Sequence, residues 1–348
     1  MVLKSHKGGV FKTKKQLYLF TRSNRMNMKI GILLSQEHRL LSVAAIQDLF
    51  ETVNRFYVED GKDPFFEIDF LHHGEKQSFI YSDYNLKEAD SETFYSIILI
   101  PAFKDNKIID GLQKNRSWVP WLVQQYRQGA ALASFCTGAF LLASTGLLDN
   151  KPATTHINAK AAFENAFPRV LLQSDAVVTE EDHLYTSGGA TNTFYLLMRL
   201  IENCCSRKIA VRAAKVFSID MDRKQQTYFG TFLPLEDHGD DIVRKTQEKI
   251  KSSYKDANTI EEIIVGIPSS RRNLVRRFKQ VTGITPIEYL QKTRIEAAKQ
   301  LLEHSRQNVM EVMLESGYND LKSFRSLFKK NVGMTPTAYR EKFNAHVL

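Results

Sequence analysis

Short apolar runs alternate with amphipathic stretches along much of the 348-residue chain. The runs KIGILLS, FFEIDFL, SIILIP and AALASF begin at residues 29, 65, 96 and 130 and are typical of buried strands. Helical spacing predicts a helix up to residue 50, one that ends at Gly129, one over residues 137–146 and one over 193–204. A hairpin is expected around Asp182. Strands that alternate with helices indicate a parallel sheet covered on both faces, so residues 28–220 are predicted to form an α/β domain.

The pattern changes near residue 220. Residues 221–240 show no clear periodicity and contain Pro234 and Gly239, which predicts a linker. Amphipathic helices then follow one another over residues 241–348, which predicts an all-α domain. Residues 1–27 are basic and are expected to form a poorly ordered tail.

The composition, 43% hydrophobic and 25% charged, is typical of a globular protein. No apolar stretch approaches the roughly 20 residues that a membrane span needs, and the start carries no signal-peptide core. The three cysteines have neither disulfide nor metal-ligand spacing. We therefore expect a cytoplasmic protein with no membrane contact, no metal and no cofactor.

The net charge of +9 is distributed unevenly. Residues 1–27 carry 7 basic residues and no acidic ones, residues 28–240 carry 21 basic and 27 acidic, and residues 241–348 carry 20 basic and 12 acidic. The positive charge therefore lies at the two ends. A basic C-terminal domain indicates nucleic acid as a partner, although a lysine-rich solvated surface would give the same charge.

A short pattern recurs in the helical domain at an offset of 50 residues (333 − 283). Phe278-Lys279, Gly283, Thr285-Pro286 and Tyr289 return as Phe328-Lys329, Gly333, Thr335-Pro336 and Tyr339. A duplication without slippage predicts two copies of one small helical unit.

Each copy reads as a helix, a turn and a second helix. In the first copy Pro268 and Ser269 break the periodicity, and Ser270 is expected to cap the second helix. Leu274, Phe278 and Val281 fall on one face of that helix. The candidate DNA-binding residues lie on and beside another face: Ser270, Arg271, Arg272, Asn273, Arg276, Arg277 and Lys279. Arg can bond guanine, Asn can bond adenine, and the remaining cations neutralise phosphates.

The second copy repeats the scheme with fewer cations. Gly317 makes the turn, Asn319 or Asp320 caps, and Phe324 and Phe328 face inward. The candidate DNA-binding residues are Lys322, Ser323, Arg325 and Lys329. A basic stripe alone is more often only a solvated surface, but two stripes in register are more specific. We expect the second copy to read fewer bases.

At these residues the chain resembles the AraC/XylS family of bacterial transcription regulators. The resemblance covers residues 241–343 and rests on RRF, TGITP, RIEAAKQLL, SGY and VGMTP. It implies two helix-turn-helix units that bind adjacent major-groove turns on one face of promoter DNA. Two positions depart from the family pattern: Pro268 stands where a turn glycine is usual, and Ser326 stands where the second unit often has Arg.

The other dense motif is SFCTGAFLLASTGLLDNKPATTH, in which a strand runs into Cys136 and a helix begins at Thr137. A side chain at such a turn lies near free backbone N–H groups, as in a nucleophile elbow. A helix N-terminus also lowers a thiol pKa and favours anions. His156 lies 20 residues further along and can approach Cys136 in space, so the motif suggests a Cys-His hydrolase. The alternative is a buried, inert cysteine.

This motif resembles the PfpI-type, glutamine-amidotransferase-like α/β fold, in the form fused to AraC-type domains in GlxA-like regulators. The resemblance extends over residues 29–220 and implies a flavodoxin-like parallel sheet. Enzymatic relatives carry a supporting carboxylate where this chain has Ser42. A serine cannot serve as that base, so the resemblance implies an effector pocket lined by Ser42, Cys136, Thr137 and His156.

The combined expectation is a transcription regulator and not an enzyme. The resemblance implies activation more often than repression. We also expect a small polar or charged effector, RNA polymerase as a partner and a homodimer, since two-fold assembly is common. Two alternatives stay open: a Cys136-dependent hydrolase or amidase with an appended helical domain, and a nucleic-acid-binding module without sequence preference.

Overall fold

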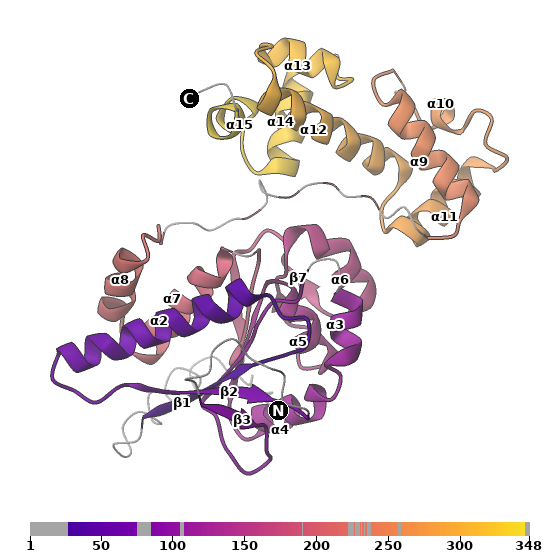
Figure 1. Ribbon diagram of the computed structural model, residues 1–348. Coiled ribbons are helices and arrows are strands. Elements are labelled where there is room, and N and C mark those ends of the chain that lie inside the picture. Colours follow the sequence, from indigo (N-terminus) through magenta and orange to yellow (C-terminus); the bar gives the residue numbers. More distant parts are fainter. Residues whose placement is uncertain are drawn as a thin grey trace, which may run out of the picture. The chain divides into compact units, whose positions relative to one another are not determined.

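The computed structural model describes residues 27–74, 85–104, 108–189, 191–221, 238–256 and 259–344, together with Gln226, Gly230, Phe232 and Pro234. These residues divide into two compact units (Figure 1). The first holds the described residues up to His156 and those from Arg169 to Lys224, and the second holds those of Ile157–Pro168 and Gln225–Leu348. The basic tail predicted over residues 1–27 lies almost wholly outside the described residues.

The first unit is built on a seven-stranded sheet of described residues in the order β3-β2-β1-β4-β5-β9-β8. The strands are β1 (Met28–Leu33), β2 (Phe66–His72), β3 (Leu86–Glu88), β4 (Ile97–Ile100), β5 (Ala131–Phe135), β8 (Val178–Glu181) and β9 (Leu184–Ser187). All neighbours pair in parallel except β8 and β9, which form the antiparallel hairpin expected around Asp182. The predicted parallel sheet is therefore confirmed. A separate pair joins β6 (Pro152–Ala153) to β7 (Leu171–Leu172).

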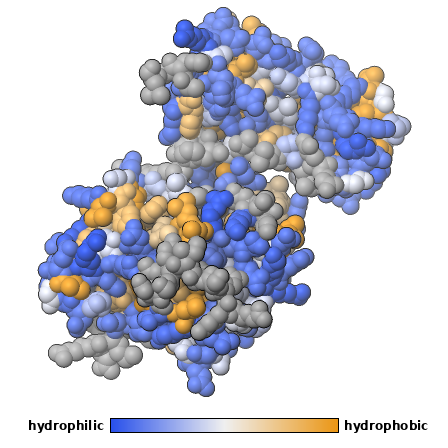
Figure 2. Space-filling view, viewed as in Figure 1, coloured by the Kyte–Doolittle hydropathy of each residue, from blue (hydrophilic) through white to orange (hydrophobic). Residues whose placement is uncertain are grey.

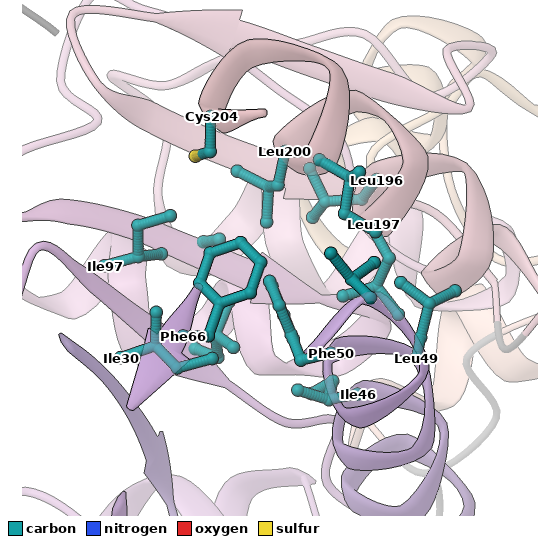
Figure 3. Packing of buried hydrophobic residues seen from close by; sticks show 14 of the residues in the cluster. Ile30, Ile46, Leu49, Phe50, Phe66, Ile97, Leu196, Leu197, Leu200 and Cys204 are labelled. Carbon is teal, nitrogen blue, oxygen red and sulfur yellow. The ribbon is translucent and has the colours of Figure 1, made fainter. Parts of the chain in front are cut away.

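Helices bury both faces of this sheet. On one side α2 (Leu40–Glu59), α7 (Asn192–Cys204) and α8 (Arg207–Val216) pack together, and Figure 3 shows the side chains of α2 and α7 gathered beside Ile30, Phe66 and Ile97. Ile98 of β4 is fully buried outside that cluster, since successive residues of a strand point to opposite faces. On that second face lie α3 (Ile108–Lys114), α4 (Trp118–Arg127) and α5 (Ala139–Ser144).

Some element boundaries differ from those predicted. The first helix was expected to end near residue 50 but continues to Glu59, because Val53 and Phe56 extend its buried face. The pattern gave no sign of α8, whose buried residues are alanines and carry a weak apolar signal. It also missed β3, β6 and β7, because strands of two or three residues are too short to show alternation.

The second unit is helical and consists of two similar halves. Its helices are η3 (Ile157–Ala159), α6 (Lys160–Ala166), α9 (Asp241–Ser253), α10 (Ile260–Ile264), α11 (Arg271–Thr282), α12 (Pro286–His304), α13 (Val309–Glu315), α14 (Leu321–Val332) and α15 (Pro336–Phe343). The long helix α12 contacts α9 and α11 of the first half and α13, α14 and α15 of the second. The predicted duplication is confirmed, although α15 was not predicted.

The residues predicted to be a linker contain the boundary between the units, which falls between Lys224 and Gln225. Asp240, the last of them, caps α9. Among the described stretches of the chain, no helix is long and apolar enough to cross a lipid bilayer.

Candidate functional site

The apolar residues of helix α11 face inward, and Ser270 caps the helix as predicted. The side chain of Ser270 accepts a hydrogen bond from the backbone N–H of Asn273, and Gly283 ends the helix with a left-handed φ of 78°. Leu274 and Phe278 are fully buried. Because the apolar stripe fixes the rotation of the helix, the opposite stripe must face solvent.

The opposite stripe carries the exposed cations Arg272, Arg276 and Lys279, and Arg271, at the start of the helix, is also exposed. Arg276 donates from Nη2 to Oδ1 of Asn273 at 3.0 Å, and Arg271 lies 2.9 Å from a carboxylate oxygen of Glu261. These partners are side chains at the surface, so exchanging them for a phosphate or a base edge requires no change in the core.

Arg277 is placed differently from its neighbours. Its Nε donates to Oδ2 of Asp240 at 2.5 Å, and its side chain is less than half exposed. The sequence grouped Arg277 with the DNA-binding residues, but here it joins α11 to the start of α9.

The helix α14 repeats the geometry of α11. Of the two predicted cap residues, Asn319 and Asp320, it is Asp320 that caps α14. Its carboxylate accepts a hydrogen bond from the backbone N–H of Ser323 at 2.7 Å. Phe324 and Phe328 are fully buried, and Gly333 ends the helix at a φ of 85°. The outer residues Lys322, Ser323, Arg325, Ser326 and Lys329 are all exposed.

The turns of the two halves share a glycine with a left-handed backbone. Gly266 has a φ of 79° and Gly317 a φ of 86°. The first half therefore has a turn glycine, two residues before Pro268.

Figure 2 shows mainly hydrophilic residues over the visible face of the second, helical unit, with a few apolar ones between them.

Cys136 lies in the first unit, where β5 ends and the short helix η2 (Cys136–Gly138) begins. Its φ is 54°, which is uncommon for a residue with a side chain and is typical of a nucleophile elbow. Gly138 allows this turn because a Cβ there would lie 2.5 Å from the carbonyl oxygen of Pro101. The thiol is fully buried.

The other predicted effector residues surround the same turn. Thr137 donates from Oγ1 to the carbonyl of Phe103 at 2.8 Å, and Thr155 donates from Oγ1 to the carbonyl of Cys136 at 3.0 Å. His156 follows Thr155 and is partly exposed. Ser42 accepts a hydrogen bond from the backbone N–H of Ala102 at 3.2 Å. The fold thus gathers all four predicted positions near the carboxyl ends of β4 and β5.

Sequence reasoning missed the loop that follows β1 at the same edge of the sheet. In this loop Glu37 has a φ of 61°, and its carboxylate lies 2.9 Å from Nζ of Lys114 and 3.6 Å from Nζ of Lys104. Burial lowers the pKa of His38 below 6.5, although its hydrogen bond to the carbonyl of Ser35 opposes the shift. The sheet order changes direction between β1 and β4, and ligands of open α/β sheets bind outside such a switch point.

This arrangement offers a positioned thiol, several polar groups and a charged loop. Position 42 supplies a hydroxyl that is already engaged, not a carboxylate. Over the described part of the chain, no group of three or more His, Cys, Asp or Glu side chains is placed to hold a metal ion.

Comparison with known proteins matches each unit to a family. Residues 72–203 match the DJ-1/PfpI family, and residues 268–342 match a helix-turn-helix domain. The chain carries a DJ-1/PfpI domain followed by an AraC-type helix-turn-helix domain. Both resemblances seen in the sequence are therefore confirmed, as is the predicted fold class.

The chain is also similar to several transcriptional regulators of Pseudomonas aeruginosa. The chain is 28% identical over 236 residues to the HTH-type transcriptional regulator GbdR of Pseudomonas aeruginosa, which is 66% of this chain and 64% of GbdR. It is 26% identical over 241 residues to the regulator CdhR and 25% identical over 224 residues to the regulator ArgR of the same organism. These matches cover 67% of this chain and 70% of CdhR, and 64% of this chain and 67% of ArgR. The match to GbdR spans just under two thirds of that protein's length.

Proposed function

We propose that the protein is a sequence-specific DNA-binding transcription regulator controlled by a small polar or charged metabolite. One observation carries the proposal: α11 and α14 lie in one compact unit, have matching caps and each expose a cationic face. Both helices contact α12, so one rigid element supports the pair. Helices of this kind can enter neighbouring major-groove turns. The relatives named above are HTH-type transcriptional regulators, which agrees with this function.

Binding to DNA is tested first by selecting preferred duplexes from a random library with the full chain. Arg276→Ala should relax base preference at one position of the selected site and cost about 1–3 kcal/mol there. Lys329→Ala should weaken binding to all sequences alike and lower the slope of log affinity against log salt by about 1. Arg244→Ala is the control, because Arg244 is exposed on α9 and pairs with Asp241. Equal losses on selected and random DNA for Arg276→Ala would favour binding without sequence preference.

The effector site is proposed at the carboxyl ends of β4 and β5, around Cys136, Thr137, His156 and Ser42. A thermal-shift screen of amino acids and quaternary amines should find compounds that raise the melting temperature of the first unit, since ligands stabilise the state they bind. His156→Ala should reduce that shift. His304→Ala is the control because His304 is exposed in the second unit. An undiminished shift in His156→Ala would remove His156 from the site.

The alternative of an enzyme depends on the thiol of Cys136. We propose that the protein is not an enzyme, because Ser42 stands where enzymatic relatives carry a carboxylate. Cys136→Ser should leave binding to the selected duplex intact. Turnover of amide or ester substrates that disappears with the same substitution would instead favour the hydrolase.

The remaining parts of the proposal concern assembly. We propose that the protein acts in the cytoplasm as a homodimer and activates transcription with RNA polymerase; the family resemblance favours activation. Sedimentation of the full chain tests the dimer. Transcription in vitro from a promoter that carries the selected site tests activation, and reduced transcript would indicate a repressor.

A further inference from the structure

The described residues between the two domains belong to the DNA-binding unit by their contacts. Lys299 of α12 donates from Nζ to the carbonyl of Gly230 at 2.6 Å. The ring of Phe232 packs edge-on against Tyr289 with centroids 5.0 Å apart, and it joins the apolar cluster that contains Phe278 of α11. This part of the chain therefore contributes to the core of the first helix-turn-helix half.

The last residues before α9 are fixed by a chain of hydrogen bonds. Asp240 donates from its backbone N–H to Nδ1 of His238 at 3.1 Å, so that nitrogen must be unprotonated. The other ring nitrogen, Nε2, then carries the proton and donates to Oε1 of Gln247 at 2.9 Å. Gln247 lies on the buried side of α9, so the ring of His238 holds Asp240 to that helix.

The carboxylate of Asp240 bridges two helices. Its Oδ1 accepts from the backbone N–H groups of Ile242 and Val243, both at 3.1 Å, which caps α9. Its Oδ2 accepts from Nε of Arg277 on α11. Burial favours the protonated acid, but the bonds from Arg277 and from the backbone outweigh it and lower the pKa of Asp240. The carboxylate is thus charged when it holds Arg277.

Arg276 and Arg277 are chemically identical neighbours with different surroundings. Successive residues of a helix lie about 100° apart around its axis, so only one of the two can point straight away from the core. Arg276 is exposed, whereas Arg277 turns toward α9. A guanidinium that is already bound to a carboxylate of 12% exposure is poorly placed to bind phosphate.

We infer that Arg277 is a positioning residue, and that Asp240 is the point at which the chain entering from the effector domain acts on the first recognition helix. This inference rests on the proposed function and specifies its regulation. A displacement of His238 and Asp240 would reach α11 through the bond between Asp240 and Arg277.

Asp240→Asn tests the inference in the full chain. Asparagine is as good an N-cap as aspartate, so α9 keeps its cap while the charge on Arg277's partner is removed. We expect affinity for the selected duplex to fall about two- to fivefold, as for a partly exposed ion pair. If Arg277 were instead a phosphate ligand restrained by Asp240, the same change would free it and binding would become tighter. Asp241→Asn is the control, because it removes an adjacent acidic charge that pairs with Arg244.

Arg277→Gln provides the second measurement. A positioning role predicts a loss of affinity equal to that of Asp240→Asn, an unchanged salt slope, and no further loss in the double variant. A salt slope lowered by about 1 would show a phosphate contact and overturn the inference. If the wild-type chain prefers no duplex sequence, the proposed function fails. Even then, the bond between Asp240 and Arg277 can be tested by melting temperature. Asp240→Asn, Arg277→Gln and the double variant should all lower it by the same amount.

Discussion

Gly317, in the turn of the second half of the helical unit, lies against Tyr254 and Lys255 of the first half, and replacing it with alanine tests that contact. A Cβ at this position would lie 2.8 Å from Nε of Arg294, 2.8 Å from the carbonyl oxygen of Tyr254 and 3.0 Å from Cα of Lys255. Two of these atoms belong to the backbone and cannot move independently. Arg294 donates from Nε to the carbonyl of Tyr254 at 2.7 Å, so the new methyl group would enter an existing hydrogen bond.

Two costs add in Gly317→Ala. The φ of 86° places alanine in the left-handed region, which costs about 1–2 kcal/mol. Loss of a hydrogen bond made by a charged group costs about 1.5–3 kcal/mol more. Arg294 is buried, so water cannot easily replace the lost partner. We expect the free energy of unfolding of this unit to fall by about 3–4 kcal/mol, a large fraction of the roughly 5–15 kcal/mol of a typical domain.

Gly266→Ala is the matched control, since Gly266 has a φ of 79° but nothing within 4 Å of its added Cβ. It should show only the backbone cost. Calorimetry of the full chain can assign the second unit as the transition that rises when duplex DNA is added. The free energies of unfolding of Gly317→Ala and Gly266→Ala should differ by about 2 kcal/mol, which corresponds to a difference in melting temperature of roughly 8–16 °C for a unit of this size. Equal melting temperatures for the two variants would show that the added methyl group at position 317 does not disturb Arg294.

Two further substitutions test other parts of the chain. Gly138→Ala should destabilise the first unit by about 3 kcal/mol or more, because its Cβ would meet the carbonyl oxygens of Pro101 and Ile100 at 2.5 and 2.6 Å; calorimetry should show only the first unit's transition lowered. The backbone N–H and the hydroxyl of Thr285 donate to Glu288 and lower the pKa of its carboxylate below 4.5. The stability that Glu288 adds is therefore complete above pH 4.5, and it is lost as the pH falls through the lowered pKa. Urea unfolding should therefore show that the wild type is more stable than Glu288→Gln at neutral pH and that the difference shrinks in acid. A difference in the free energy of unfolding that stays constant with pH would contradict this prediction.

Local features of the fold could be predicted from the sequence because their causes are local. Ser270 acts through a hydrogen bond within one helix turn, and it caps α11 as expected. The offset of the repeat also required the two halves to share one architecture. The strand-to-helix pattern around Cys136 predicted an elbow there, and the left-handed φ of Cys136 agrees.

Features that join distant parts of the chain were not predictable in this way. Ser42 bonds to Ala102, 60 residues away, and Glu37 is paired with Lys114, 77 residues away. Neither pair has a characteristic spacing, because the sheet order brings the segments together. The alanines of α8 form a buried face only because α2 and α7 lie against them.

The sequence by itself determined that this protein has a parallel α/β domain followed by two copies of a cation-faced helical unit. The spacing of apolar residues and the repeated motif are both visible in the sequence without a structure. Only the tertiary structure decided which cations of those helices face solvent. Arg276 and Arg277 are indistinguishable as letters, and the difference arises because Asp240, 37 residues from Arg277, lies beside one of them. A side chain's role depends on its partners, and the partners are chosen by packing.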